Sequence, residues 1–276
     1  MKIDLHLHSC YSGDGIHNIG FLTRLFSAGD IVALTDHETI AGWDEFKDEC
    51  EKRGLKPIFG IEWFADNCHI LSYFPNPNVS EGFKEFISER RKREKNTMRF
   101  VAESYNKELS SFPQYDSLLN MKKHPEDTLG MLVLACKIKR IKGLDFKKAI
   151  EEIRVRKHSY SECPEIFNTE KLIAKLSAWG GINILAHPFR RKDCDEKAMK
   201  KFFKLIIKYK SSGLNGIELH PNDNDLNTKI KEICRRLDLI WTIGSDYHCH
   251  KAGIYPIYLS RGDVDILHGL RKVKLI

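Results

Sequence analysis

The first fifteen residues, MKIDLHLHSCYSGDG, contain four side chains that can bind a metal ion or transfer a proton: Asp4, His6, His8 and Asp14. One residue separates the two histidines, so their side chains lie on the same face if this segment is a β-strand. Near the other end of the chain, the segment SDYH gives the same spacing to Asp246 and His248. These pairs indicate a polar site built where strands end.

Further histidines and carboxylates lie at the ends of other strand-like segments. His37 ends one in TDH, Glu62 ends one in GIE, and His187 ends one in AHP, while His69 begins the segment that follows Glu62. In β/α barrels the functional groups gather at the C-terminal ends of the strands, so we expect six histidines and three carboxylates, including Asp14 in a glycine-flanked loop, to meet there. Nitrogen and carboxylate ligands without cysteine suit zinc, manganese or iron. Nine such groups exceed the needs of one ion.

The elements that would position these groups are seven short apolar segments: 2–8, 30–37, 55–62, 69–74, 181–187, 214–220 and 239–246. Helical patterns separate most of them, for example at 40–53, 169–180 and 227–238. This alternation predicts an α/β fold with parallel strands, and seven strands without a GxGxxG motif or P-loop favour a small closed barrel. The link from Glu62 to His69 is shorter than the dozen or so residues of a parallel crossover, so we expect segment 69–74 to run antiparallel.

Residues 81–168 interrupt this alternation. They begin with a long helical run, EGFKEFISERRKREKNTMRFVAESYNKEL, and continue with the helical segments TLGMLVLACKIKRI and DFKKAIEEIRVRK. A connection of this length is far outside the normal range between strands. We therefore predict a barrel formed by residues 1–80 and 169–276, and a helical insertion at 81–168 that covers one end of it.

Composition restricts the class of protein. The chain has 276 residues, of which 42% are hydrophobic and 30% charged, as in ordinary soluble globular proteins. Its apolar runs are too short for a membrane span, and acid and histidine interrupt the start MKIDLHLHS, so we expect a cytoplasmic protein without a signal peptide. Eight scattered cysteines without a CxxC pair predict reduced thiols rather than disulfides.

The net charge of +7 is concentrated in basic runs at 90–95, 137–157 and 190–192. Such runs can be solvated helix faces, or they can attract an anionic substrate such as a phosphate ester or nucleic acid. Charge alone does not separate these alternatives.

The segments DLHLHS, TDH, GIE, AHP and GSDYH resemble the sequence blocks of the PHP (polymerase and histidinol phosphatase) family, and His69 matches a further family histidine. The resemblance spans nearly the whole chain and implies a distorted (β/α)7 TIM-like barrel with a trinuclear metal site at its C-terminal face. It implies two or three divalent ions (Zn, Mn or Fe) with these ligands: His6, His8, Glu62 and Asp246 for the first ion, Glu62, His69 and His187 for the second, and Asp14, His37 and His248 for the third.

The resemblance further implies a metal-dependent phosphoesterase in which the ion held by His6, His8, Glu62 and Asp246 activates a hydroxide. The insertion and RRKREKN resemble the branch that acts on nucleotides and nucleoside bisphosphates, so we expect a small anionic phosphoester as substrate and no membrane partner. The alternatives are a 3'-5' exonuclease or another nucleic-acid-processing PHP enzyme, and, in a different class, a non-catalytic metal-stabilised binding module. Nine intact ligands argue against the binding module.

Candidate substrate contacts come from the basic runs. Arg90 and Arg93 are three positions apart on one predicted helix face, Asn96 lies three further along, and Arg190 belongs to the third run. The planar guanidinium group suits a phosphate because it can bind two oxygens. Asp4 and Asp36 precede ligand histidines, and we expect them to orient these ligands. The native metal, the exact substrate and the oligomeric state stay open.

Overall fold

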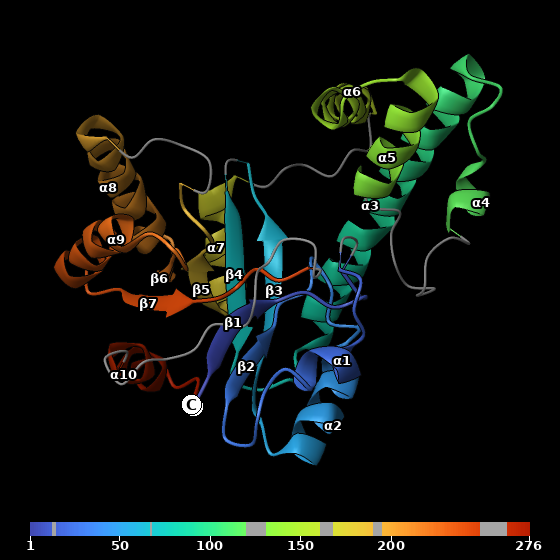
Figure 1. Ribbon diagram of the computed structural model, residues 1–276. Coiled ribbons are helices and arrows are strands. Elements are labelled where there is room, and N and C mark those ends of the chain that lie inside the picture. The colour runs from blue at the N-terminus through green and yellow to red at the C-terminus, as the bar shows by residue number, and fades with distance from the viewer. Residues whose placement is uncertain (13–14, 67, 120–130, 161–167, 190–194, 249–263) are drawn as a thin grey trace.

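The computed structural model describes residues 1–12, 15–66, 68–119, 131–160, 168–189, 195–248 and 264–276 (Figure 1). Its centre is a seven-stranded sheet in the order β1-β2-β3-β4-β5-β6-β7. The strands are β1 (Ile3–Leu7), β2 (Ile31–Leu34), β3 (Lys56–Phe64), β4 (His69–Phe74), β5 (Ile182–Leu185), β6 (Leu214–Leu219) and β7 (Ile240–Ile243). All seven coincide with the predicted segments, so the strand pattern of the sequence is confirmed.

Strand β4 is the exception to the parallel arrangement. It pairs antiparallel with β3 on one side and with β5 on the other, and the remaining neighbours are parallel. The pairing of Phe64 with His69 shows that the chain turns back tightly after β3. The predicted reversal is confirmed, and it brings His69 to the end of the sheet where β3 finishes.

The sheet curls so that its first and last strands approach each other. At this junction His8 N donates to Tyr247 O at 3.1 Å, and Asp246 N donates to His6 O at 2.9 Å. The two ligand pairs recognised in the sequence thus lie on neighbouring backbone segments. With the surrounding helices, this curled sheet confirms the predicted distorted TIM-like barrel (Figure 1).

A β-bulge in β1 determines which face its histidines occupy. The pairing of β1 with β2 runs through Ile3–Ile31, Asp4–Val32 and Leu7–Leu34. Between the last two pairs β1 carries one more residue than β2, which interrupts the alternation of faces. Accordingly, Leu5 packs in one buried apolar cluster and Leu7 in another. The side chains of His6 and His8 both point toward Glu62 on β3.

The helices around the sheet are α1 (Ile19–Thr23), α2 (Trp43–Arg53), α7 (Thr169–Ala178), α8 (Glu196–Ser211), α9 (Asn224–Arg236) and α10 (Val264–Lys272). Several begin at side chains that accept a hydrogen bond from the first turn: Asn168 from Lys171 N, Asp195 from Ala198 N and Asp223 from Leu226 N. Helix α2 ends at Gly54, which adopts a left-handed conformation (φ 65°). Within the described residues, no helix combines the length and the apolar character that crossing a membrane requires.

The segment predicted as a helical insertion contains α3 (Glu81–Glu108), α4 (Tyr115–Leu119), α5 (Met131–Lys142) and α6 (Phe146–His158) (Figure 1). Near the start of α3, Phe83, Phe86 and Ile87 join the apolar cluster of the barrel. Further along α3, residues such as Met98 and Tyr105 join a separate cluster with α4, α5 and α6. Helix α3 therefore connects the curled sheet to α4, α5 and α6.

Candidate metal centre

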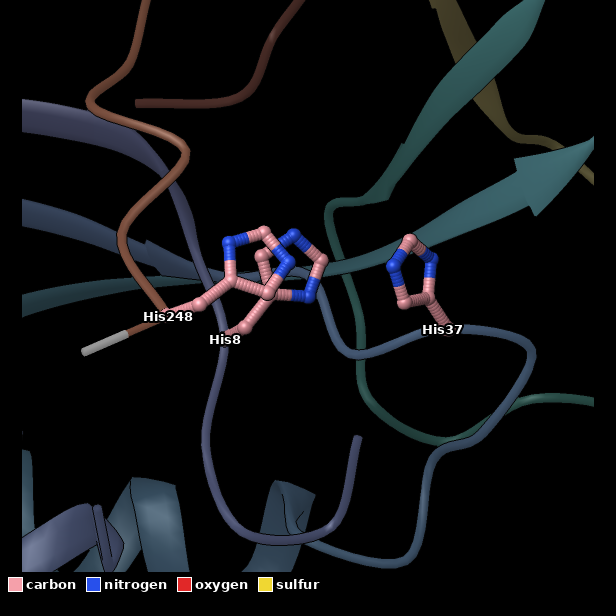
Figure 2. A group of neighbouring side chains, drawn as sticks. All are labelled: His8, His37 and His248. Carbon is pink, nitrogen blue, oxygen red and sulfur yellow. The ribbon is translucent and has the colours of Figure 1, made fainter. Parts of the chain in front are cut away.

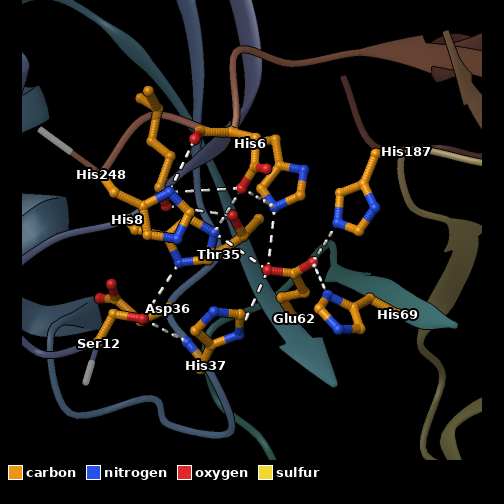
Figure 3. Close-up of polar contacts among 12 residues, drawn as sticks. His6, His8, Ser12, Thr35, Asp36, His37, Glu62, His69, His187 and His248 are labelled. Atoms are coloured by element: carbon orange, nitrogen blue, oxygen red, sulfur yellow. Dashed lines mark hydrogen bonds and ion pairs between the residues drawn. The ribbon is translucent and has the colours of Figure 1, made fainter. Parts of the chain in front are cut away.

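Glu62 on β3 is buried and lies among histidine side chains from neighbouring strand ends (Figure 3). Its Oε2 atom lies 3.1 Å from both His6 Nε2 and His8 Nε2. The Nδ1 atom of His37, from the segment after β2, lies 3.3 Å from the same oxygen. Three ring nitrogens from two neighbouring segments thus converge on one carboxylate oxygen.

The other carboxylate oxygen of Glu62 faces a second pair of histidines. Its Oε1 atom lies 2.8 Å from Nδ1 of His69, the first residue of β4, and 2.9 Å from Nε2 of His187, which follows β5. Because β4 runs antiparallel, its first residue and the residues after β5 lie at the same end of the sheet. Glu62 therefore separates two groups of histidines, one on each oxygen.

Asp246 and His248, from the segment after β7, complete the cluster. Asp246 Oδ1 lies 3.4 Å from both His6 Nε2 and His8 Nε2. The rings of His8 and His248 stack with their centroids 4.1 Å apart, and the centroid of His37 lies 4.5 Å from that of His8 (Figure 2). Histidines from three separate chain segments therefore lie side by side.

Residues with left-handed backbones at this end of the sheet include Glu38 (φ 49°), His187 (φ 27°) and Asp246 (φ 52°). This region is unfavourable for residues with a side chain. Strain of this kind persists when the surrounding structure imposes it, and it is concentrated at functional sites. Here it occurs at two candidate ligands and beside a third.

The donor atoms fit a metal centre. Two groups have ligand atoms that all lie within 4.8 Å of one another: His6, Glu62, His187 and Asp246, and His8, His37 and His248. Among the described residues, His6 Nε2, His8 Nε2 and Glu62 Oε2 are buried without a well-directed hydrogen bond. Each of the two nitrogens lies 3.1 Å from Glu62 Oε2, close to the ~3.4 Å between ligands that each lie about 2.1 Å from a tetrahedral ion. Buried polar atoms aimed at one point are what a divalent cation requires.

The electrostatics agree with this fit. Burial lowers the pKa of His6, but the carboxylates of Glu218, Glu62 and Asp246 outweigh burial and raise that pKa well above its ordinary value. Burial raises the pKa of Glu62, yet His6 and His37 hold it well below its usual range. Burial also raises the pKa of Asp246, but His6 and His8 outweigh burial and lower that pKa below its ordinary value. The carboxylates thus favour positive charge beside them, which protonated His6 supplies and which a divalent cation would replace on binding.

Comparison with known proteins identifies the family. A model of the PHP domain matches residues 4–209. The chain belongs to the PHP domain family. A 5'-3' exoribonuclease of Haemophilus influenzae is 26% identical over 259 residues, which is 90% of this chain and 90% of that protein.

Solved structures with a similar fold include a candidate metal-dependent phosphoesterase from Bifidobacterium adolescentis, with a TM-score of 0.69 and 23% identity over 98% of this chain and 96% of that one. An amidohydrolase from Chromobacterium violaceum, whose structure holds sulfate and no metal, has a TM-score of 0.68 and 20% identity over 95% of this chain and 93% of that one. At these identities the similarity shows that this PHP chain shares the fold of both structures, and nothing about activity.

The structure brings together eight of the nine residues predicted as metal ligands: His6, His8, His37, Glu62, His69, His187, Asp246 and His248. Asp14 lies outside the described residues. The cluster at the C-terminal end of the PHP barrel therefore supports binding of divalent metal ions.

Asp4 and Asp36 accept hydrogen bonds from backbone N–H groups of the PHP site, and Asp36 also accepts one from a serine hydroxyl. Asp4 Oδ1 accepts hydrogen bonds from His6 N at 3.2 Å and from Ser245 N at 2.9 Å. Asp36 accepts from the backbone and the hydroxyl of Ser9. Both aspartates therefore fix the chain segments that carry the histidines.

Glu218 on β6 has a role in the PHP site that the sequence analysis missed. It is buried, and its Oε1 atom lies 2.9 Å from His6 Nδ1. The signal that could have identified it is a second GIE tripeptide at residues 216–218, which repeats the one ending at Glu62. His220, two residues further along, lies in the turn after β6, where its Nδ1 accepts a hydrogen bond from Asn222 N.

The residues predicted to contact the substrate differ in burial and in their ion-pair partners. Arg90 is buried against the barrel and paired with Glu38 (Figure 1 shows α3 beside β3). Arg93 is half exposed and pairs with Glu89 within the same helix, and Asn96 is partly exposed. Arg190 lies outside the described residues.

Proposed function

We propose that this PHP protein hydrolyses phosphate esters with two or three divalent ions held at the strand ends. The observation that carries this proposal is the buried Glu62 carboxylate, whose two oxygens each face a separate set of histidine nitrogens. One carboxylate between two sets of ligands is suited to bridge two ions. Family membership and the fold of a candidate metal-dependent phosphoesterase support a hydrolase acting on phosphoesters.

The proposed ligand sets follow the contacts around Glu62. His6, His8, Glu62 and Asp246 would hold the first ion, Glu62, His69 and His187 the second, and His37 and His248, with Asp14, the third. When bound, such ions lower the pKa of a water molecule to near neutrality and withdraw charge from the phosphoryl oxygens as it develops.

The chain itself supplies the rigid frame of the site. Glu62, His69 and His6 lie on strands whose pairing fixes their spacing before any ligand arrives. The histidines are held by neighbouring residues: His8 Nδ1 lies 3.1 Å from Ser12 Oγ, and the same hydroxyl accepts from His37 N at 3.0 Å. Preorganised ligands of this kind avoid a cost of reorganisation when substrate binds.

A small phosphate ester, such as a nucleotide or nucleoside bisphosphate, is the substrate class that we propose. Helix α3 brings Arg90 close to the candidate ligands, since Arg90 pairs with Glu38, the residue that follows His37. We propose Arg93, Asn96 and Arg190 as contacts for a substrate phosphate, and also Arg90 if it exchanges Glu38 for the phosphate. Their guanidinium groups would hold phosphate oxygens that the metals do not reach.

A second candidate function is exonucleolytic cleavage of RNA. The observation that favours it is the relative in Haemophilus influenzae, a 5'-3' exoribonuclease that matches 90% of this chain. The polarity of that relative is opposite to the 3'-5' alternative considered from the sequence. The excess of basic residues on the chain, net charge +7, suits a polyanionic substrate as well as a small one.

A substrate panel tests both candidates. The metal-loaded protein is incubated with nucleoside monophosphates, nucleoside 3',5'-bisphosphates and short RNA labelled at either end, beside Glu62→Gln. Turnover of the small esters, reduced to background in the variant, supports the main proposal. Faster stepwise shortening of RNA supports the second candidate. Absence of any turnover by a metal-loaded protein would overturn both and favour the non-catalytic binding module.

A further inference from the structure

Glu218 touches two candidate metal ligands, His6 and His187, which contact different oxygens of Glu62. It sits near the end of β6, its side chain is 2% exposed, and both carboxylate oxygens are engaged. Oε1 lies 2.9 Å from His6 Nδ1, and Oε2 accepts a hydrogen bond from His187 N at 2.7 Å. This buried carboxylate therefore connects β6 to both halves of the cluster.

The contact with His6 fixes the tautomer of that ring. A neutral imidazole carries one N–H group, and only the other nitrogen can bind a metal. His6 Nε2 faces Glu62 and Asp246 at 3.1 and 3.4 Å, so the proton belongs on Nδ1 if Nε2 is the ligand. Glu218 accepts that proton, and the negative charge of the acceptor makes the opposite nitrogen a stronger ligand.

The contact with His187 acts on the backbone. His187 has φ 27°, a conformation that residues with a side chain rarely adopt. The hydrogen bond from its N–H to Glu218 Oε2 stabilises this conformation, in which His187 Nε2 lies 2.9 Å from Glu62 Oε1. The same side chain thus holds the ring of His6 and the strained backbone of His187.

The packing around this contact leaves no room for another arrangement. A Cβ atom added to Gly244, just after β7, would lie 2.2 Å from His6 Cβ and 2.8 Å from Glu218 Oε1. Only glycine at this position allows β1, β6 and the segment after β7 to approach closely enough for the contact. The sequence GSDYH therefore includes a residue required by the His6–Glu218 pair as well as two candidate ligands.

We propose that Glu218 is a positioning residue, which holds His6 in the Nδ1–H tautomer and His187 in its strained backbone conformation so that both can bind metal. This inference rests on the proposed function in one respect, namely that these histidines bind metal. It does not depend on which phosphoester is the substrate. Removing such an outer carboxylate typically weakens metal affinity about 10- to 100-fold.

The test compares Glu218→Ala and Glu218→Gln with the wild-type protein and with Glu232→Gln, which changes an exposed glutamate on α9. Zinc affinity is measured by competition with a chelator. We expect a loss of about 10- to 100-fold in Glu218→Ala, a smaller loss in Glu218→Gln, which keeps one acceptor oxygen, and none in Glu232→Gln. If Glu218→Ala fails to fold, Glu218→Gln alone decides.

A second measurement separates positioning from general stability. In the zinc-loaded wild-type protein, the Nδ1–H proton of His6 should give a resonance protected from solvent exchange, and the amide of His187 should also exchange slowly. At saturating zinc, Glu218→Ala should lose both protections while amides in the core of β3 keep theirs. Unchanged affinity and unchanged His6 and His187 exchange in the variants would overturn the proposal and leave the proposed function standing. A wild-type protein that binds neither zinc, manganese nor iron would overturn both.

Discussion

Arg90 and Glu38 form an ion pair that joins the helical insertion to the loop carrying His37. Arg90 Nε donates to Glu38 Oε2 at 3.1 Å, and a second guanidinium nitrogen donates to Oε1. Both side chains are nearly buried, 8% and 13% exposed. The guanidinium carbon lies 5.9 Å from the ring centroids of Trp63 and Phe86. Because Glu38 N also donates to Glu62 O, this pair ties α3 to the backbone of the metal centre.

The first prediction concerns the stability that this pair provides. Arg90→Ala leaves the Glu38 carboxylate buried without its main counter-charge, which should lower the free energy of unfolding by on the order of 3 kcal/mol. Arg93→Ala removes a half-exposed partner of Glu89 and should change it by less than about 0.5 kcal/mol. Chemical denaturation of the metal-loaded proteins measures both values.

A double-mutant cycle with Glu38→Ala serves as the control for this prediction. If the ion pair is the cause, the double variant should be less destabilised than the sum of the two single variants. Additive effects would show that Arg90 acts through its packing on Trp63 and Phe86 instead.

Arg90 and Arg93 also show which features of the helix the sequence predicts and which it does not. A spacing of three places Arg90 and Arg93 near one another on a helix, and the long helix predicted from residue 81 is present. Spacing does not reveal what the helix packs against, because that depends on segments distant in sequence. Arg90 is buried against Glu38, in the segment after β2, whereas Arg93 is half exposed.

The strands that carry the candidate ligands were easier to predict from the sequence than the contacts that hold those ligands in place. Period-two spacing, strand length and the short link before His69 were sufficient for seven strands and one reversal. The bulge in β1 and the contact of Glu218 with His6 arise from pairing between strands, which a single sequence does not display. The sequence shows two glutamates near the ends of buried strands, Glu62 and Glu218, but only the structure shows that both contact His6.

The second prediction tests Glu62 as the centre of the metal site. Elemental analysis of the purified wild-type protein should find more than one equivalent of transition metal per chain. Glu62→Gln removes the charge that faces histidines on both oxygens, so it should lose most of this metal and reduce turnover to background while circular dichroism stays unchanged. Glu103→Gln, an exposed position on α3, is the matched control. Full metal content in Glu62→Gln would contradict a bridging role.

The third prediction concerns Arg93 as a phosphate contact. Loss of a charged hydrogen bond costs about 1.5–3 kcal/mol, so Arg93→Ala should lower kcat/KM for a nucleotide roughly ten- to a hundredfold. Metal content should not change, and a small activated phosphate ester that does not reach α3 should be hydrolysed almost as before. Lys92→Ala, which alters the neighbouring exposed cation, is the control. Equal losses on both substrates would indicate a structural role, and no loss would contradict the contact.

The last prediction follows from Asp4, whose buried carboxyl accepts hydrogen bonds from the backbone of His6 and Ser245. Burial raises its pKa from 3.8 to about 7, although hydrogen bonds from Ser245 and His6 oppose the shift. The folded protein therefore holds a proton on Asp4 that the unfolded chain releases near pH 4. This contribution to stability is present below about pH 4 and is lost as the pH rises through 7, at up to about 1.4 kcal/mol per pH unit. Asp4→Asn keeps an acceptor oxygen and cannot ionise. In the metal-free protein its free energy of unfolding should thus rise relative to wild type between pH 4 and 7, whereas that of Asp48→Asn, an exposed position on α2, should not. Parallel pH profiles for wild type and Asp4→Asn would show that Asp4 stays ionised in the fold.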